Sequence, residues 1–359
     1  MMRKYNISLT IILILVFVIH CSESKWKGKI YKEQDAVVIE NYGAGLWGDI
    51  IDDKISFNKE ISLGKMSGED YLMFNNSIDV AVGSDLNIYV LDMGNHRFIK
   101  FDKKGNYRWT AGRKGQGPGE LQNPQKIRIK PQKEVCVLDG NFLIHIYDIH
   151  GKYKDTIRLE QSTEDFQYID DQRIFVRTPI PNYTGLAAAI SSNEFEMIKE
   201  FPVDYPYGPK ISGWGDIGGD IQWIQNAVYM VLPDKYEIRK YDLNGKLLQK
   251  IKRDFKFEPP EVKRRGGGFR ISRKNRMGLC FFDQKRGCLI NQFFQIIGEN
   301  EPDIEIVFYL DFFNDGGKFL GSFKLPGPRR LMAIDSDGKY YFVNYDPFPG
   351  VIRSSLIIN

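Results

Sequence analysis

The sequence predicts an all-β fold built from repeated four-stranded sheets, and three observations favour it. The chain of 359 residues is 42% hydrophobic and holds 24 Phe and 19 Tyr, residue types that favour strands. Its 34 Gly and 16 Pro supply turns without approaching a low-complexity composition. Short apolar runs separated by Gly, Asn and Asp also recur at a regular spacing, which indicates one large repeat domain over residues 37–359.

The repeat is clearest when the first two copies are aligned. Val90-Leu91-Asp92 of the first copy aligns with Val137-Leu138-Asp139 of the second, and Gly105 aligns with Gly151, a spacing of 47 or 46 residues. Later copies are weaker but keep the same order of apolar strands and Asp/Gly turns. The copies lie at residues 78–109, 127–157, 166–201, 228–251, 269–325 and 333–343.

A period of about 45 residues with four short strands per repeat is typical of a β-propeller, and this chain has room for about six such blades. One four-stranded sheet cannot bury both of its faces alone, so the sheets pack radially against one another. Alternating apolar residues such as Val80 and Val82 then face a neighbouring sheet. The last repeat, Leu331 to Asn359, is short of one outer strand.

Two motifs resemble known propeller repeats. Asp92-Met93-Gly94-Asn95-His96-Arg97-Phe98 resembles an NHL repeat, and Gly115-Gln116-Gly117-Pro118-Gly119-Glu120 resembles the glycine-rich link between the blades of bacterial six-bladed propeller lipoproteins. The resemblance covers most of the chain after the N-terminal segment. It implies an NHL-like, six-bladed β-propeller in which Ile55 to Leu63 completes the last blade, so that strands near both termini close the ring.

The N-terminal segment predicts export and lipid anchoring. A short basic stretch precedes an apolar run over residues 7–19, which is shorter than a membrane span and is typical of a signal peptide over residues 1–20. Cys21 follows at once and resembles the acylated cysteine of a bacterial lipoprotein, although His20 stands where a small residue is usual. An uncleaved signal anchor is the alternative. We expect residues 21–36 to be a polar tether that holds the domain at a membrane of the cell envelope.

The remaining cysteines lie within the repeats. Cys280 and Cys288 flank a turn over residues 283–287, which makes them candidates for a hairpin disulfide in an oxidising compartment. Cys136 lies between two valines and is predicted to be buried without a disulfide partner.

One basic stretch and one set of inner-strand residues are candidate binding sites. Residues 263–276 carry seven positive charges and no acid, and they predict a basic loop that attracts anionic partners. Arg128, Gln222 and Arg270 fall in strands predicted to line the central channel, where propellers usually bind ligands. The alternatives are a solvated loop and a solvent-filled channel lining. The basic residues of the loop, apart from Arg270, are Lys263, Arg264, Arg265, Arg273, Lys274 and Arg276.

The sequence assigns no residue a catalytic role, and we predict neither a metal nor a cofactor. Asp92, His96 and Arg97 belong to a blade turn if the resemblance to NHL repeats holds. Asp335-Ser336-Asp337-Gly338 lacks the rest of an EF-hand calcium loop, and no two histidines have metal-ligand spacing.

Two functions remain open. The leading hypothesis is a non-catalytic lipoprotein of the cell envelope that binds or scaffolds a protein or anionic glycan partner. A propeller hydrolase or lyase acting in the central channel is the alternative, but such enzymes usually gather acidic, His or Asn metal ligands from several inner strands. The inner-strand candidates here are mainly Arg, Lys and Gln. The net charge of +4 and the predicted export both argue against nucleic acid as a partner.

Overall fold

The structure, a computed structural model, describes most of the chain after the predicted signal peptide. Cys21 and the predicted lipid site lie outside the described residues. Within the described part, no helix is long and apolar enough to cross a membrane. The described residues are 25–359 except 76, 132–133, 179–183, 192–193, 203–219, 233–234, 257–260, 266–267, 273–274 and 298–304.

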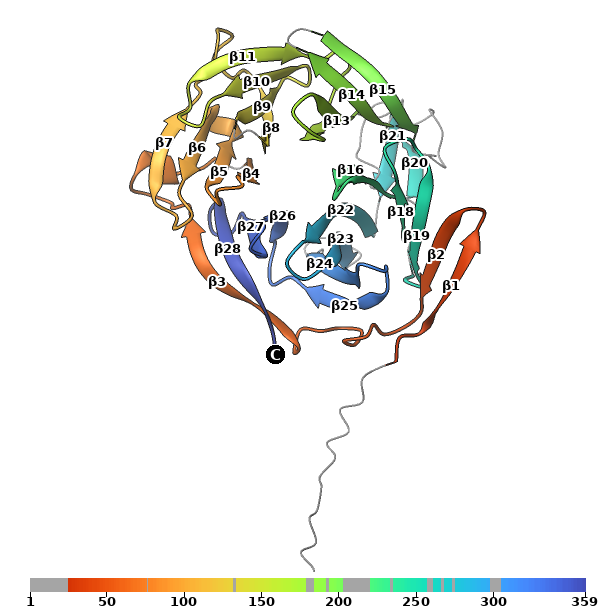
Figure 1. Cartoon of the computed structure of the whole chain (residues 1–359). Coiled ribbons are helices and arrows are strands. Elements are labelled where there is room, and N and C mark those ends of the chain that lie inside the picture. Colours follow the sequence, from red (N-terminus) through yellow and green to blue (C-terminus); the bar gives the residue numbers. More distant parts are fainter. Residues whose placement is uncertain are drawn as a thin grey trace, which may run out of the picture.

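Six four-stranded blades surround a central space, and the fold is the six-bladed β-propeller that the sequence predicts (Figure 1). Blade 1 consists of β4 (Ile78–Val82), β5 (Ile88–Asp92), β6 (Arg97–Phe101) and β7 (Tyr107–Ala111). Blade 2 consists of β8 (Pro124–Ile129), β9 (Val135–Asp139), β10 (Leu143–Tyr147) and β11 (Tyr153–Arg158). Blade 3 consists of β12 (Asp165–Tyr168), β13 (Arg173–Arg177), β14 (Thr184–Ser191) and β15 (Glu194–Pro202).

The second half of the ring follows the same order, from the innermost strand outward. Blade 4 consists of β16 (Asp220–Ile224), β17 (Ala227–Val231), β18 (Glu237–Tyr241) and β19 (Leu247–Arg253). Blade 5 consists of β22 (Asn275–Asp283), β23 (Cys288–Ile297), β24 (Glu305–Asn314) and β25 (Phe319–Lys324). Blade 6 consists of β26 (Arg330–Ile334), β27 (Lys339–Asn344), β28 (Gly350–Ile358) and β3 (Ile55–Leu63). Two short 3-10 turns, η1 (Asp70–Leu72) and η2 (Met93–Asn95), flank strands of blade 1.

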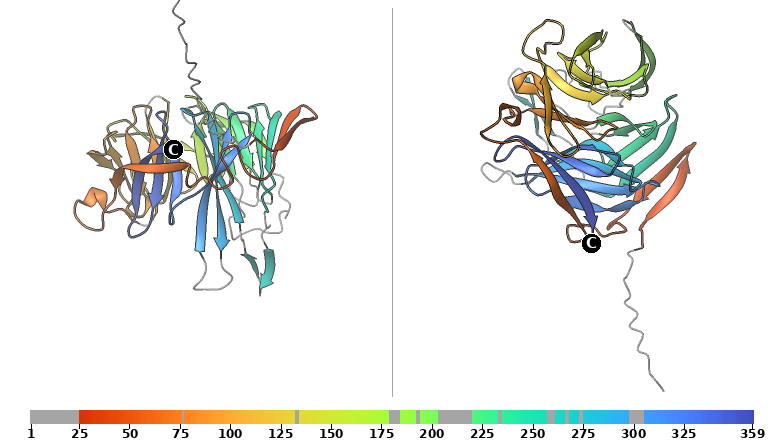
Figure 2. Two further views of the ribbon diagram at one scale, coloured as in Figure 1. Left: turned by 90° about the horizontal axis from the view of Figure 1, so that it is seen from below. Right: turned by 60° about the vertical axis from the view of Figure 1, so that its left-hand side comes forward.

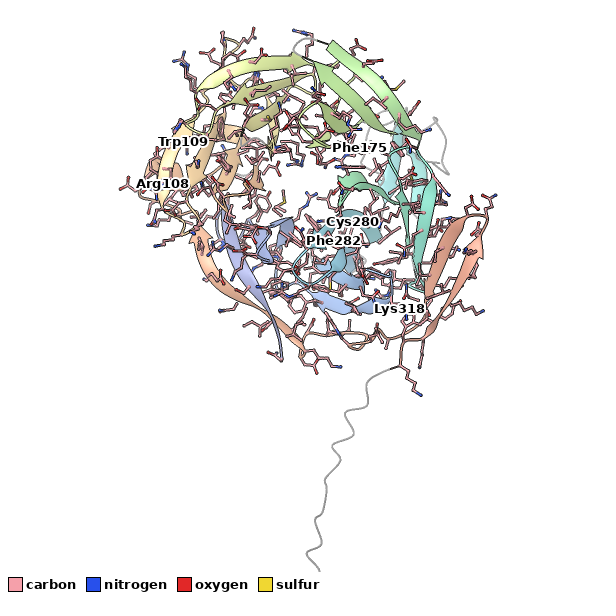
Figure 3. The ribbon with its side chains drawn as sticks, in the orientation of Figure 1. Arg108, Trp109, Phe175, Cys280, Phe282 and Lys318 are labelled. Atoms are coloured by element: carbon pink, nitrogen blue, oxygen red, sulfur yellow. The ribbon has the colours of Figure 1, made fainter. Side chains whose placement is uncertain are left out.

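The hydrophobic core lies between neighbouring blades. Among the described residues it divides into six clusters of buried side chains, one for each pair of adjacent blades. Alternation along each strand explains this division, because Tyr89 of β5 packs toward blade 2 whereas Val90 packs toward blade 6. Figure 3 shows the difference between Phe175, which is buried between blades 3 and 4, and Arg108 at the outer rim.

Aspartate–glycine turns close the outer hairpins, as the repeat predicts. In blade 1 the Asp102 carboxylate accepts a hydrogen bond from the backbone N–H of Lys104 (2.8 Å), and Gly105 takes a φ of 85°. That backbone conformation favours glycine because a Cβ atom would be strained there. Asp148 and Asp242 accept backbone hydrogen bonds in the equivalent turns of blades 2 and 4.

Residues 28–63 run around the outside of three blades, and we call them the N-terminal strap (Figure 1). The strap begins with the hairpin β1 (Gly28–Glu33) and β2 (Ala36–Asn41), and β2 pairs in parallel with β19 of blade 4. It then passes the rim of blade 5, where the Trp47 N–H donates to the Leu320 carbonyl (2.7 Å). The strap ends as β3, which pairs with β28 along the rim of blade 6. The expected pairing of Ile55–Leu63 with the last repeat is therefore present.

Two predictions about local structure are corrected. Residues 28–33 form β1, although a tether was expected up to residue 36, because the strand that holds the hairpin in place lies more than 200 residues away in the sequence. The predicted disulfide is absent, since Cys280 and Cys288 are free thiols. The hairpin pairs Asp283 with Cys288, which places Cys280 opposite Asn291. The two thiols therefore point to opposite faces of blade 5, one toward blade 4 and the other toward blade 6.

Cys136 is buried and free, as predicted. Its thiol lies 3.1 Å from the Tyr168 hydroxyl, between blades 2 and 3. Burial raises the pKa of the Cys136 thiol to about 12, so the thiol is protonated and unreactive near neutral pH.

Candidate functional site

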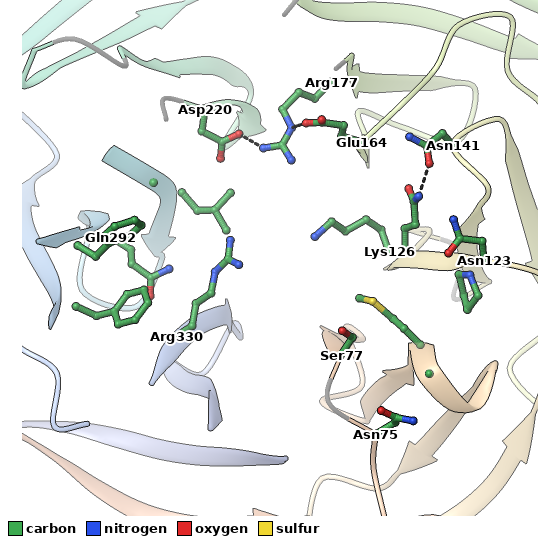
Figure 4. A pocket seen from close by; sticks show the side chains of 18 of the residues that line it. Asn75, Ser77, Asn123, Lys126, Asn141, Glu164, Arg177, Asp220, Gln292 and Arg330 are labelled. Atoms are coloured by element: carbon green, nitrogen blue, oxygen red, sulfur yellow. Dashed lines mark hydrogen bonds and ion pairs between the residues drawn. The ribbon is translucent and has the colours of Figure 1, made fainter. Parts of the chain in front are cut away.

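The innermost strands of the blades frame a cavity at the face of the ring where those strands begin. We call this face the front and this cavity, of about 880 Å³, the front cavity. Its walls come from all six blades, and Figure 4 shows polar side chains reaching into it from several sides. A cavity of this size is in the range that takes a small organic ligand or the end of a larger one.

Two cationic side chains point into the front cavity. Lys126 comes from β8 of blade 2 and Arg330 from the first position of β26 in blade 6, and Figure 4 shows both reaching into the same space. Arg330 is exposed and Lys126 is half-buried. Neither makes an ion pair with any residue that the structure describes, so both charges are available to a ligand.

Gln292 fixes the start of β26 and thereby the position of Arg330. This buried side chain donates from Nε2 to the Leu331 carbonyl (3.3 Å) and accepts from the Leu331 N–H (2.6 Å). Such a pair of hydrogen bonds satisfies both backbone groups of Leu331, the residue after Arg330. Through Gln292, blade 5 therefore fixes the backbone next to Arg330.

The acidic side chains of the cavity are occupied by a neighbouring arginine. The Arg177 guanidinium bonds to the buried Asp220 carboxylate, and its Nε lies 3.6 Å from Glu164 Oε2 (Figure 4). This cluster joins blades 3 and 4 at the cavity wall. Arg177 therefore contacts both acids of the cavity wall.

Uncharged polar side chains and an aromatic wall complete the cavity. Asn75, Ser77 and Asn123 face it from blades 1 and 2 (Figure 4). On the side of blade 5, Phe294 and Phe308 lie opposite each other across β23 and β24, with ring centroids 5.7 Å apart. These two strands continue past the cavity and project from the ring in the left view of Figure 2.

A second cavity of about 480 Å³, the rear cavity, lies at the opposite end of the innermost strands, and Leu279 lines both. Arg128 and Gln222 line the rear cavity, so two of the three residues predicted to line the channel do so. Gln222 bonds to the neighbouring Asp220 carboxylate. The sequence did not indicate which residues Arg128 contacts.

Arg128 joins three blades through buried ion pairs. Its guanidinium donates to Asp79 of blade 1 (2.9 Å) and to both carboxylate oxygens of Asp165 of blade 3 (2.5 and 2.7 Å). It also donates to the Phe166 carbonyl (3.1 Å). Burial alone would raise the pKa of Asp165, but the charges of Arg128, Lys126 and Arg177 hold it below its ordinary value. Arg128 therefore links blades 1, 2 and 3, and its charge is already bound by Asp79 and Asp165.

Arg270 is not in an innermost strand. It lies in β21 (Gly268–Ser272), which among the described strands pairs with β20 (Glu261–Arg265) alone, and this two-stranded sheet is separate from the six blades. The innermost strand of blade 5 is instead β22, which starts at Asn275. The alternating pattern around Arg270 does predict a strand, but it cannot show which strand pairs with it.

The basic segment is likewise a hairpin rather than a loop where the structure describes it. Lys263, Arg264 and Arg265 lie in β20, and Arg276 lies in β22. Arg273 and Lys274 lie outside the described residues. The left view of Figure 2 shows β20 and β21 projecting to the same side of the ring as β23 and β24.

The turn that contains Asp92, His96 and Arg97 is held together by its own side chains. The buried Asp92 carboxylate accepts from Arg97 Nε (3.0 Å) and from Asn95 Nδ2 (2.8 Å), and His96 Nδ1 lies 3.1 Å from the Leu121 carbonyl. Asp335 accepts backbone and Tyr341 hydrogen bonds within its turn. In the part of the chain that the structure describes, no group of three or more His, Cys, Asp or Glu side chains is arranged to hold a metal ion.

Sequence reasoning missed Lys126 and Arg330, the two charges that the structure leaves open. One signal was available for Lys126, which stands just before the predicted inner strand at Ile127 and two residues before Arg128, so that it would face the same side as Arg128 if the strand began earlier. Arg330 stands at the boundary of a strand, where side-chain direction is not set by alternation.

Comparisons with known proteins support the fold. A family model described as a 6-bladed beta-propeller (DUF5128) matches residues 75–206. The structure is similar to that of a member of the DUF4221 family from Bacteroides vulgatus, with 13% identity and a TM-score of 0.60, covering 86% of this chain and 99% of that one. It is also similar to a putative exported protein from Bacteroides fragilis, with 12% identity and a TM-score of 0.55, covering 90% and 99%. No curated protein matches the chain.

Proposed function

We propose that this protein is an exported, lipid-anchored module of the cell envelope that binds a protein or glycan partner at the front cavity without chemically changing it. The observation that carries the proposal is the pair Lys126 and Arg330. Two cations that the fold leaves without ion-pair partners among the described residues, aimed into one concave space, are suited to an anionic group of a partner.

The chemistry of the cavity favours binding over turnover. Arginine stays protonated at any physiological pH, so Arg330 holds charge and does not transfer protons. The two carboxylates of the wall, Glu164 and Asp220, are bound by Arg177. A carboxylate acting as general acid or base would have to contact the ligand to exchange a proton with it, whereas here both carboxylates contact Arg177.

Export is supported by the N-terminal sequence and by one structural relative. The apolar run before Cys21 has the layout of a signal peptide. The similar structure from Bacteroides fragilis is itself described as a putative exported protein. Attachment through Cys21 would hold the propeller at a membrane, with the rest of the chain as one body in the aqueous envelope.

Photo-crosslinking in living cells tests the proposal. A photoreactive amino acid replaces Ser77, an exposed residue of the front cavity, in the full-length protein, and the control carries it at Lys59 on the outer strand of blade 6. We expect an adduct at position 77 that is lost in Lys126→Ala/Arg330→Ala and is not formed at position 59. An adduct that persists in the double variant would contradict the proposal. Recovery of a cleaved ligand would favour the hydrolase or lyase instead.

A further inference from the structure

We infer that the partner of the front cavity is an acidic oligosaccharide, whose carboxylate or sulfate group binds between Lys126 and Arg330. This inference deepens the proposed function and rests on it. Three properties of the cavity carry it: the two open cations, the uncharged polar wall and the aromatic wall of blade 5.

The charged group is recognised from two sides. Lys126 enters from blade 2 and Arg330 from blade 6, so an anion between them is held by side chains of two separate blades (Figure 4). The guanidinium offers a planar fork that matches carboxylate or sulfate oxygens, and the ammonium adds a compact charge. The hydrogen bonds of Gln292 to Leu331 hold the Arg330 backbone in place before a ligand arrives.

The uncharged part of the wall suits hydroxyl groups. Asn75, Ser77 and Asn123 each carry a side chain that both donates and accepts hydrogen bonds. A sugar hydroxyl also does both. A saccharide ring displays such groups around its whole circumference, which fits polar side chains presented to one cavity by two blades.

The aromatic wall distinguishes a saccharide from a small inorganic anion. Phe294 and Phe308 form a cross-strand pair beside the cations. The C–H face of a sugar ring is apolar and can pack on these rings, as other apolar surfaces do. Beyond the pair, Ile306 lies on the same face of β24 as Phe308 and is 48% exposed where the strands project, so the wall continues outside the cavity and can follow a chain of several sugar units.

The arrangement favours a saccharide over an acidic peptide. A peptide carboxylate would satisfy Lys126 and Arg330 equally, but its backbone amides would also require partners along an extended line. The neutral polar side chains instead come from the two neighbouring blades 1 and 2 and face one cavity (Figure 4). The basic hairpin strand β20, with Lys263, Arg264 and Arg265, projects to the same side of the ring and would attract further acidic units.

Calorimetric titration of the full-length protein in detergent tests the inference. The acidic probes are trigalacturonate, which carries carboxylates only, and a chondroitin sulfate tetrasaccharide. The comparison probes are fully methyl-esterified trigalacturonate and tri-glutamate. We expect Lys126→Ala and Arg330→Ala each to weaken binding of an acidic saccharide by roughly 10-fold, because each removes a charge-assisted hydrogen bond. Lys59→Ala/Arg108→Ala, which removes two exposed rim charges, is expected to leave the affinity unchanged.

Phe308→Ala distinguishes binding of a saccharide from binding of other anions. We expect this variant to weaken binding of the acidic saccharide several-fold and to leave any weak binding of tri-glutamate as it was, although Phe308 also packs against the core between blades 5 and 6. If the variant lowers the melting temperature, Phe308→Leu keeps the packing and removes only the aromatic face. Preference for carboxylate or sulfate follows from which acidic probe binds more tightly.

The outcomes separate the inference from the proposed function. Binding of tri-glutamate that exceeds that of both saccharides and depends on Lys126 and Arg330 would overturn the saccharide and leave the binding module in place. Equal binding of the esterified probe would overturn the role of the two charges. If neither saccharide nor tri-glutamate binds in a way that depends on these residues, both the inference and the proposed site fail.

Discussion

Replacing Arg128 by alanine should destabilise the propeller rather than only weaken ligand binding. The substitution removes the counter-charge of two buried carboxylates, Asp79 and Asp165, that belong to different blades. Loss of one partner from a buried ion pair typically costs about 3–5 kcal/mol, because a buried charge is left uncompensated. We expect the lower end, about 3 kcal/mol, for a structural reason. The backbone N–H groups of Ile127 and Phe166 continue to donate to these carboxylates (3.0 and 2.7 Å).

The destabilisation should depend on pH. In the native protein the pKa of Asp165 lies below its ordinary value, so the stability that its charge contributes is present above about pH 4 and is lost as the pH falls through the lowered pKa. Without Arg128, burial would raise that pKa and the folded variant would take up a proton as the pH falls. The difference in the free energy of unfolding between the native protein and the variant should therefore be largest near pH 7 and shrink toward pH 4.

Chemical denaturation at pH 7 and pH 4 measures both effects. Arg108→Ala is the matched control, because Arg108 pairs with Asp102 at the exposed rim, where removal of an ion pair costs at most about 1 kcal/mol. Arg128→Lys keeps the positive charge but loses the planar guanidinium that contacts both carboxylates. Its cost in the free energy of unfolding should lie between those of Arg128→Ala and Arg108→Ala. A cost for Arg128→Ala no larger than that for Arg108→Ala, or one independent of pH, would refute the structural role of Arg128.

Three further predictions concern the strap, the thiols and the N-terminus. Asn41→Ala should cost roughly 3 kcal/mol in urea unfolding, because the buried Asn41 amide donates to the carbonyls of Lys252 and Gly317 and accepts from the Phe319 N–H. An unchanged unfolding midpoint would contradict a stabilising role of the N-terminal strap. Alkylation without reductant at pH 8 should leave Cys136, Cys280 and Cys288 unmodified in the folded protein and label all three in denaturant, since all three are buried and burial raises the pKa of each thiol. Labelling of only one in denaturant would indicate a disulfide between the other two. Mass spectrometry of the mature protein should show a diacylglyceryl group on an N-terminal Cys21, and an intact chain with an unmodified Cys21 would exclude it.

The sequence was informative wherever structure depends on local chemistry. The Asp-x-x-Gly turns at Asp102 and Asp148 were recognisable because a short side chain and a glycine fix the backbone within four residues. The alternation of Val80 and Val82 in β4 likewise predicted which side chains enter the spaces between blades. The resemblance to six-bladed propellers, together with the missing outer strand in the last repeat, pointed to Ile55–Leu63, which pairs with β28.

Long-range pairing was the part that the sequence did not reveal. The hairpin of β1 and β2 is placed by a parallel contact with β19, and no periodic signal connects those segments. Arg270 was assigned to the channel because its neighbours alternate, but alternation is equally strong in a hairpin that stands outside the ring. Cys280 and Cys288 were brought together by assuming a centred turn, and a shift of register separated them to opposite faces.

Charge pairing explains why Lys126, and not Arg128, marks the candidate site. Both residues lie in the same innermost strand two positions apart, and residue type alone favours arginine as a ligand-binding group. Where the innermost strands meet, however, Asp79 and Asp165 require a buried counter-charge, and Arg128 supplies it. Arg177 does the same for Asp220. Lys126 and Arg330 are lining cations that make no ion pair with a residue that the structure describes, so they can bind a ligand without competing with the bonds that hold the blades together.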